Sequence, residues 1–254
     1  AENYPHPLDR DVAALNAELT SLRDQFIWAP GRIVWDDPAA IEEGIVEGRM
    51  AKALFRKIRA LQSELLIESA YFVTRDKAVE VVKQLHDRGV RIRVLTNSLA
   101  SNDVVAAHAG HAKRREQLIE AGMELYEYRA DSRIGKTRAY RGESKAALHT
   151  KAIVFDRESV FIGSFNLDPR SASINTEAGL YIESPELAAQ VIAYMDEGVQ
   201  PVNSYRVLLD ENGKLVWVTE IDGEEVRYRR EPEASFGQRF MSGFIMLLPV
   251  EHQL

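Results

Sequence analysis

Apolar side chains recur at near-helical spacing at the start of the chain. This spacing predicts a helix that begins after Asp11 and extends to about Phe26. The Pro30-Gly31 pair ends that pattern, because proline and glycine both interrupt helices. A short strand is predicted at 33–35, and a second helix at about 38–61.

From residue 65 onward, short runs rich in branched apolar residues alternate with helical patterns. The predicted strands are 65–73, 90–96 and 124–128, and the predicted helices are 75–88 and about 103–121. This alternation predicts an α/β fold with a mixed, mostly parallel sheet that helices cover on both faces.

Residues 147–182 contain three further strand-like runs joined by short links, which favour antiparallel pairing. His149 and Lys151 are two positions apart, so an extended backbone directs both side chains to one face, which Ile153 and Phe155 continue into a core. On the second run, Ser164 and Asn166 share a face in the same way, and Glu177 begins the third run.

One side of the sheet is therefore predicted to gather an imidazole, an ammonium, an amide, a hydroxyl and a carboxylate. Such a set suits phosphoryl chemistry, because it offers a nucleophile, a cation, donors for phosphate oxygens and an acid that orients the imidazole. The alternative is a buried structural His149 beside a Lys151 whose amine extends to solvent.

The spacing His149-x-Lys151-x4-Asp156, followed by Gly163-Ser164-Phe165-Asn166, resembles the HKD signature of the phospholipase D superfamily. Other segments are similar to the C-terminal catalytic half of bacterial cardiolipin-synthase-type phospholipases D. They are residues 65–75, 90–99, 162–171 and 207–254.

The resemblance implies that a complete active site combines two HKD motifs, one histidine attacking phosphorus and the other transferring protons. His149 matches one of these two, Lys151 and Asn166 match ligands of the phosphate oxygens with Ser164 beside them, and Glu177 matches the carboxylate that orients the imidazole. Only one HKD motif is visible, so a second half is expected, from a missing N-terminal domain or from a second copy in a homodimer.

Asp156 is expected to have a supporting, structural role. It lies seven residues past His149, which is about 23 Å along an extended strand.

Four further residues are candidates for a substrate rim. Tyr71 and Asn97 follow predicted parallel strands, whose carboxyl ends gather ligands in such sheets. His108 lies on the helix after Asn97, and Arg138 belongs to a basic loop, 129–145, that leads into the HKD strand.

The C-terminal part is predicted to decorate the main sheet. Asn212-Gly213 and Asp222-Gly223 are hairpin signals, so 205–232 predicts a three-stranded meander. Phe236, Phe240, Phe244 and Leu247 would line one face of a final helix. That helix either docks on the core by this face or lies in a membrane surface. The predicted organisation is a catalytic half, 1–200, with the meander and helix, 201–254, packed on or beside it.

Composition and charge narrow the classes of partner and cofactor. The chain has 254 residues, a net charge of −7 and no cysteine, so disulfides and thiolate chemistry are excluded. An acidic protein is a poor general binder of nucleic acid. No metal or other cofactor is expected, since lysine and histidine supply the positive charge. No apolar run is long enough to cross a bilayer, and Ala1 suggests a fragment or a processed product.

The leading hypothesis is a phosphatidyltransferase half that acts on phospholipids at the cytoplasmic face of a bacterial membrane, as a peripheral protein. Water as acceptor would give phosphodiester hydrolysis instead of transfer. The alternatives are a homodimeric HKD phosphodiesterase or nuclease and a non-catalytic membrane-binding or regulatory module.

Overall fold

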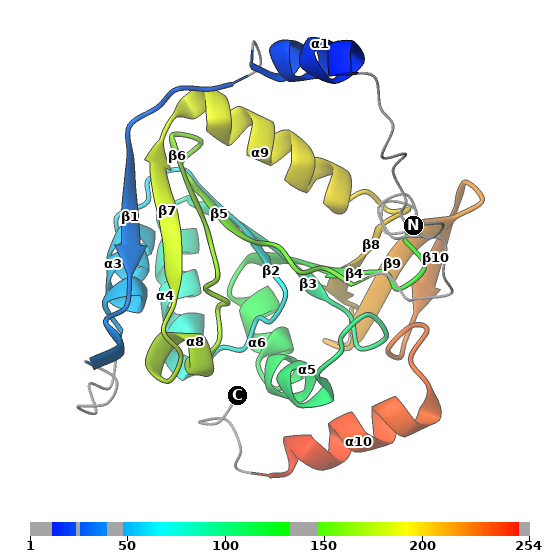
Figure 1. The fold of residues 1–254 in the computed structure, drawn as a ribbon. Coiled ribbons are helices and arrows are strands. Elements are labelled where there is room, and N and C mark those ends of the chain that lie inside the picture. Colours follow the sequence, from blue (N-terminus) through cyan, green and yellow to red (C-terminus); the bar gives the residue numbers. More distant parts are fainter. Residues whose placement is uncertain (1–11, 24–25, 40–47, 133–146, 249–254) are drawn as a thin grey trace.

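The described residues are organised around one ten-stranded sheet. The computed structural model describes residues 12–23, 26–39, 48–132 and 147–248. Across the sheet the strand order is β1-β7-β6-β5-β2-β3-β4-β8-β9-β10 (Figure 1). The strands are β1 Gly31–Trp35, β2 Glu64–Ser69, β3 Arg91–Asn97, β4 Met123–Tyr128, β5 Lys151–Phe155, β6 Ser159–Gly163, β7 Ala178–Glu183, β8 Ser204–Leu209, β9 Leu215–Ile221 and β10 Glu224–Tyr228.

Helices cover both faces of this sheet, as predicted for the α/β class. They are α1 Val12–Arg23, α3 Arg49–Arg59, α4 Asp76–Asp87, α5 Val105–Ala112, α6 Arg115–Glu120, α8 Pro169–Ser173, α9 Pro185–Gly198 and α10 Phe236–Met246. Side chains of α3, α4 and α6 bury the larger core against one face, and α9 buries a smaller cluster around Val154 and Val160 against the other. In Figure 1, α9 lies above the central strands and α6 below them.

Parallel pairing is less extensive than the sequence predicted. Within the described residues, β2 pairs with β3 and β3 with β4 in parallel, and the remaining neighbours in the sheet are antiparallel. The parallel part is the segment where helices link the strands. The links β5–β6 and β8–β9–β10 are too short for a crossover and therefore form hairpins.

The predicted meander is present, and it continues the main sheet. Strand β8 pairs with β4, and β9 and β10 follow it outward. Asp222 (φ 53°) and Gly223 (φ 85°) both adopt the left-handed conformation that a two-residue hairpin turn requires. The boundary predicted at residue 200 is therefore crossed by backbone hydrogen bonds of one continuous sheet.

Two predicted helices differ from the observed ones. The helix expected at about 103–121 is divided into α5 and α6 by a turn at Lys113 and Arg114. His111 of α5 and Arg115 of α6, on either side of this turn, both contact the carboxylate of Glu127. Of the helix expected at 38–61, α3 is the described part, and 40–47 lie outside the described residues.

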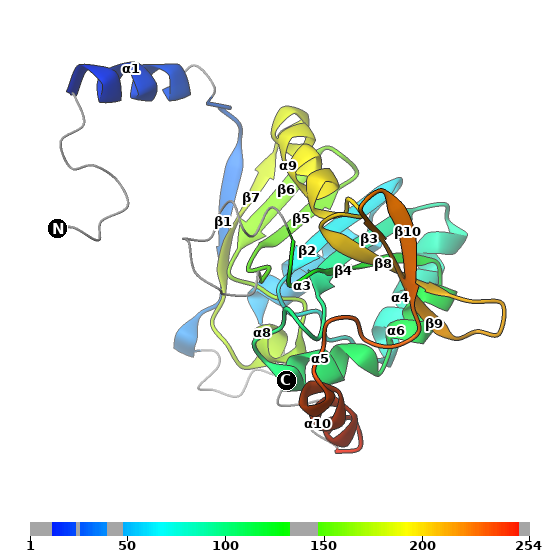
Figure 2. The ribbon, with the colours of Figure 1, turned by 90° about the vertical axis from the view of Figure 1, so that its right-hand side faces the viewer.

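The first and last helices lie at opposite ends of the molecule. Helix α10 packs on α5 at the end where α8 also lies, and α1 is at the far end (Figures 1 and 2). None of the helices among the described residues is long and apolar enough to cross a membrane.

Candidate active site

The candidate site lies where β2 and β6 finish and where β5 and β7 begin, a region we call the site end of the sheet. Lys151, the first residue of β5, pairs with Ser69, the last residue of β2. Gly163, at the end of β6, pairs with Gly179 of β7. A side chain at Gly163 would collide with the Ala178 carbonyl, so glycine lets the two strands approach closely here.

His149 and Lys151 occupy the entry to β5. Ile153 and Phe155 are buried in the larger core, as the alternation predicted, and Lys151 precedes them on the same face. The His149 side chain is exposed, which excludes the buried structural histidine. Lys151 is half-buried, and its Nζ donates a hydrogen bond to the His149 carbonyl oxygen over 3.0 Å.

Three carboxylates act on the charge of Lys151. Burial lowers the pKa of Lys151, and the negative charges of Glu177, Asp168 and Asp103 oppose that shift. These carboxylates stabilise the ammonium form, which is the form that can neutralise charge on a phosphate.

Asn97 was predicted for the substrate rim, and that prediction is wrong: its side chain is buried and its amide is engaged by backbone. Its Nδ2 donates to the carbonyl oxygens of Ala70 (3.0 Å) and Leu148 (2.9 Å). Its Oδ1 accepts from the Leu148 N–H (2.8 Å) and from Ser101 Oγ (3.1 Å). Asn97 therefore fixes the backbone of the residue immediately before His149.

Ser164 and Glu177 are brought into direct contact. Ser164 Oγ donates to Glu177 Oε2, and the Ala178 N–H donates to Ser164 Oγ over 3.0 Å. Asn175 Nδ2 donates to Glu177 Oε1 over 3.2 Å. Within the described residues Glu177 makes no hydrogen bond to His149, so the expected contact between this carboxylate and the imidazole is not formed here.

Asp36 holds the backbone of Glu177, and the sequence analysis did not single it out. The Asp36 N–H donates to the Glu177 carbonyl oxygen over 2.8 Å, and Asp36 Oδ2 accepts from the Glu177 N–H over 3.2 Å. Asp36 Oδ1 accepts from the Met50 N–H over 2.8 Å and so ties the start of α3 to the same point.

Asn166 follows β6 in the loop that leads to α8. Its side chain is buried, and its Oδ1 has no hydrogen-bond partner among the described residues. A buried polar atom without a partner is uncommon in proteins and often marks a functional position. The Asn166 Oδ1 thus keeps an unused capacity to accept a hydrogen bond.

Asp168 is a second acidic residue that the sequence did not single out. Its Oδ1 accepts the Ser171 N–H over 2.6 Å and caps α8. Burial raises the pKa of Asp168, and the nearby charge of Glu177 adds to this effect. An Asp-Pro pair at a helix start was the signal that could have located it.

Asp156 lies at the other end of β5 from Lys151 and binds backbone. Its carboxylate accepts hydrogen bonds from the N–H groups of Gln62, Ser63 and Glu64, at 2.7 to 3.1 Å. These contacts join the end of β5 to the start of β2.

Tyr71 lies beside the site, directly after β2. It is half-buried, and its hydroxyl donates to Asp103 Oδ1 over 2.8 Å. Burial, together with the Asp103 carboxylate, raises the pKa of Tyr71 to about 12.

His108 was also predicted for the rim, and the structure contradicts this. Its ring is fully buried, and its Nε2 lies 3.1 Å from Glu231 Oε1. Helical spacing alone could not distinguish an inward from an outward direction for this residue. Arg138 and most of the basic loop lie outside the described residues.

Comparisons with known proteins show the family to which the chain belongs. Residues 54–198 match the family described as "Cardiolipin synthase, PLD-like domain". The chain belongs to this phospholipase D-like family. It is 38% identical over 229 residues to cardiolipin synthase C of Escherichia coli K12, covering 89% of this chain and 48% of that protein.

Two further similarities show how much of a longer protein this chain matches. A Helicobacter pylori J99 protein of uncharacterised function is 26% identical over 98% of this chain and 45% of its own length. A crystal structure of Haemophilus influenzae phosphatidylserine synthase aligns with a TM-score of 0.53 at 14% identity, over 89% of this chain and 48% of that one, which shows the shared fold. The chain spans about half the length of the curated relatives it matches.

Proposed function

We propose that this chain supplies one half of the active site of a phosphatidyltransferase of cardiolipin-synthase type. The observation that carries the proposal is the exposed His149 beside the half-buried Lys151, at the same end of the sheet as Ser164, Asn166 and Glu177. The membership of the chain in the family supports it.

The chemistry requires two histidines. One imidazole nitrogen attacks the phosphorus of a phospholipid, and the P–O bond to the leaving alcohol breaks as the second histidine protonates that alcohol. The second histidine then removes the proton of the incoming alcohol, whose oxygen attacks phosphorus and releases the first histidine. His149 fills one of these two roles.

Lys151 and Asn166 would bind the phosphoryl oxygens. Negative charge grows on these oxygens in the transition state, and a fixed ammonium in a partly dry site stabilises it more than water does. Glu177 would orient the imidazole of His149 once substrate or the second half closes the site. Its present bond to Ser164 keeps the carboxylate at the site end.

The second histidine would come from another HKD half, either elsewhere in the same protein or in a second copy of this chain. The relatives are about twice as long as the part matched here, which supports the first route. The substrates would be phospholipids, met at the cytoplasmic face of a bacterial membrane by a peripheral protein. Nucleic acid is not expected as a partner, because the net charge of −7 opposes it.

The test is transfer between two phospholipids in vesicles, catalysed by the complete protein that contains this chain. A labelled phosphatidyl group should move to a phospholipid alcohol in the wild type, and His149→Ala should abolish this transfer. His86→Ala, which changes an exposed histidine of α4, is the matched control and should retain the wild-type rate. Transfer by His149→Ala at the wild-type rate, or hydrolysis of nucleic acid without lipid transfer, would contradict the proposal.

A further inference from the structure

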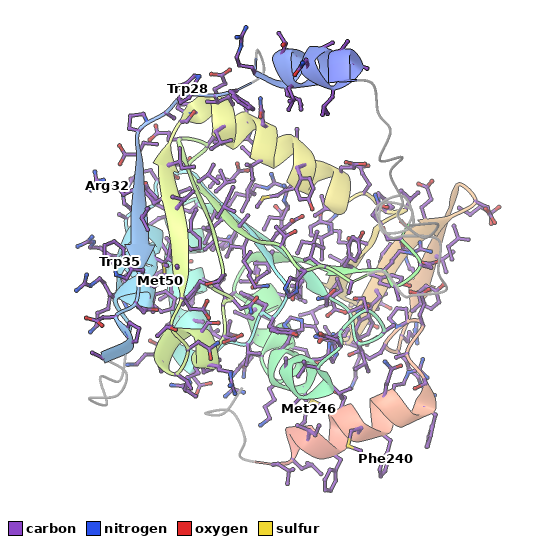
Figure 3. The ribbon with its side chains drawn as sticks, in the orientation of Figure 1. Trp28, Arg32, Trp35, Met50, Phe240 and Met246 are labelled. Carbon is purple, nitrogen blue, oxygen red and sulfur yellow. The ribbon has the colours of Figure 1, made fainter. Side chains whose placement is uncertain are left out.

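Helix α10 presents its apolar side to solvent and its small polar side to the protein. The exposed fractions are 82% for Phe236, 64% for Phe240, 51% for Phe244 and 83% for Leu247, whereas Ser242 is 5% exposed. Of the two arrangements that the sequence left open, docking on the core by this phenylalanine face is therefore wrong. Figure 3 shows Phe240 on the side of α10 that points away from the body.

Polar contacts, rather than the phenylalanines, fasten α10 to the protein. Ser235 and Gln238 form a reciprocal cap at its start, with bonds of 2.9 and 3.1 Å between side chain and backbone. Gln238 Nε2 also donates to the Leu99 carbonyl oxygen over 3.2 Å. At the other end, Lys113 Nζ donates to the Leu248 carbonyl oxygen over 3.2 Å.

A buried ionic cluster holds the segment that leads into α10. Glu231 Oε1 accepts from Arg115 Nη2 over 2.6 Å and lies 3.1 Å from His108 Nε2. The exposed Arg239 of α10 donates back to the Glu231 carbonyl oxygen over 2.8 Å. Because the anchor does not use the phenylalanine face, this face is free to bind something else without loss of attachment.

Helix α10 lies at the same end of the molecule as the candidate active site. Its partner α5 follows β3, and both views show α5, α8 and α10 at one end (Figures 1 and 2). Leu99, which accepts the bond from Gln238, is two residues past Asn97, the residue that fixes the backbone before His149. A surface that received the phenylalanine face would therefore meet the molecule at the site end.

Cationic side chains lie beside α10. A groove of about 560 Å³ runs between α10, α6 and β9, and Trp217 and Met246 contribute apolar walls to it. Lys113, Arg230 and Arg239 line the same groove, together with the acidic Glu116 and Glu231. Apolar side chains flanked by lysine and arginine are typical of helices that lie in the surface of an anionic bilayer.

We infer that α10 is a membrane-docking helix whose Phe236, Phe240, Phe244 and Leu247 enter the surface of an anionic phospholipid bilayer. The inference rests on the proposed function, because it supplies a way for the site end to reach lipid head groups. The cationic Lys113, Arg230 and Arg239 beside α10 favour an anionic bilayer over a protein partner as the occupant of this face.

A first experiment places a probe on the helix. The chain has no cysteine, so Phe240→Cys provides a single attachment point for an environment-sensitive fluorophore, and Leu19→Cys on the exposed side of α1 provides the matched control. Vesicles that contain phosphatidylglycerol should shift the emission of the Phe240→Cys label to the blue and leave the Leu19→Cys label unchanged. Equal shifts at both positions, or none at position 240, would overturn the inference.

A second experiment measures binding by sedimentation with the same vesicles. The double variant Phe240→Ser/Phe244→Ser should bind about tenfold or more weakly, because each phenylalanine loses its transfer from water to the bilayer. Leu19→Ser/Leu22→Ser should bind like the wild type. Circular dichroism of both variants verifies that the fold is retained.

The alternative occupants have distinct signatures. If the wild type does not bind vesicles but forms dimers that Phe240→Ser/Phe244→Ser dissociates, the face is a contact between proteins and the inference fails. Binding is measured without turnover, so vesicle binding by an inactive protein would contradict the proposed function and leave α10 as the docking helix. Full transfer activity together with unchanged vesicle binding by the double variant would contradict the docking role of α10 and leave the proposed function in place.

Discussion

Two clusters of the protein combine a histidine, a carboxylate and a cation, and they differ in their access to solvent. At the site end, His149 is exposed and Lys151 is half-buried. Beneath α5, by contrast, His111, Arg115 and Glu127 are all buried. The same three kinds of side chain thus form an open group at the edge of the sheet and a closed group inside the protein.

The side chains of the closed group form hydrogen bonds with one another and with Trp217. Glu127 Oε1 accepts from Arg115 Nη1 over 2.5 Å and lies 3.2 Å from His111 Nε2, and Glu127 Oε2 accepts from Trp217 Nε1 over 2.7 Å. Burial disfavours the charged form of Glu127, but the positive charge of Arg115 and the hydrogen bond to His111 together outweigh it and lower the pKa of this carboxyl. The open group has unused hydrogen-bonding capacity instead, as Asn166 Oδ1 shows. Burial therefore separates a structural use of these side chains from the chemical use that we propose for the open group.

The largest expected effect is on stability, from the closed group. Glu127→Ala should lower the free energy of unfolding by about 3 to 5 kcal/mol, because Arg115 would remain buried without its main counter-charge. Urea unfolding measures this loss. The matched control is Glu124→Ala on the same strand, whose carboxylate pairs with the partly exposed Arg91 and should cost about 1 kcal/mol or less. Equal losses in the two variants would remove the distinction between the clusters.

The second largest expected effect is a lower rate of phosphatidyl transfer, caused by a substitution in the open group. In the complete protein, Lys151→Met should reduce phosphatidyl transfer about 10²- to 10³-fold, because one fixed charge on the phosphoryl oxygens is lost. The unfolding free energy should change little. The exposed Lys214→Met, in the turn before β9, serves as the control for both measurements. A variant that kept its activity but lost stability would place Lys151 in the structural class.

Asn97 connects the interior to the open group, so its substitution should lower both the free energy of unfolding and the transfer rate. Asn97→Ala leaves the carbonyl and N–H groups of Leu148 without partners and should cost about 2 to 3 kcal/mol of stability. The rate should also fall, by about tenfold, because His149 follows Leu148 directly. Urea unfolding and initial rates test the two parts separately. Asn212→Ala, in an exposed turn, should change the unfolding free energy by less than about 0.5 kcal/mol.

Acid should weaken the closed group. Burial lowers the pKa of His111, although Glu127 opposes the shift. The unfolded chain therefore binds a proton below about pH 6.5 that the folded chain does not, and stability falls as the pH decreases. The lowered pKa of Glu127 acts in the same direction below about pH 4.3. His111→Gln should reduce the stability loss between pH 7 and pH 5 by about 1 to 2 kcal/mol, and the exposed His86→Gln should not.

The last prediction is that metal chelation has no effect on the transfer rate. Chelation with EDTA should leave the transfer rate unchanged, because Lys151 and the two histidines supply the positive charge at phosphorus. Initial rates with and without EDTA decide this. A loss of activity that a divalent cation restores would show that the open group requires a metal and is not sufficient by itself.

Local patterns predicted the direction of side chains on a strand and the position of a turn better than they predicted contacts between distant residues. The alternation His149, Lys151, Ile153, Phe155 predicted which face of β5 enters the core, because period-two spacing on a strand directly determines the direction of a side chain. The Asp222-Gly223 pair located a hairpin for a similarly local reason, its positive φ angles. These features depend on neighbours within a few residues.

The residues that the sequence misjudged depend on distant partners. Asn97 contacts Leu148, 51 positions away, and His108 contacts Glu231, 123 positions away. Helical periodicity identified the apolar face of α10 but not whether this face packs inward. In the structure it is Ser242, on the other side of the helix, that is buried against the protein. Pairing across the sheet is set by tertiary contacts of this kind, which spacing along the chain does not encode.

The pairing of β8 with β4 has a practical consequence for anyone who shortens this protein. A version that stopped at residue 200 would expose the edge of a central strand and take Trp217 away from Glu127. Unpaired strand edges form hydrogen bonds with strands of other molecules, so such a truncated protein should aggregate rather than stay folded and active. Strands β8 to β10 are thus an integral part of the sheet, and truncations that map the activity should begin at the N-terminus.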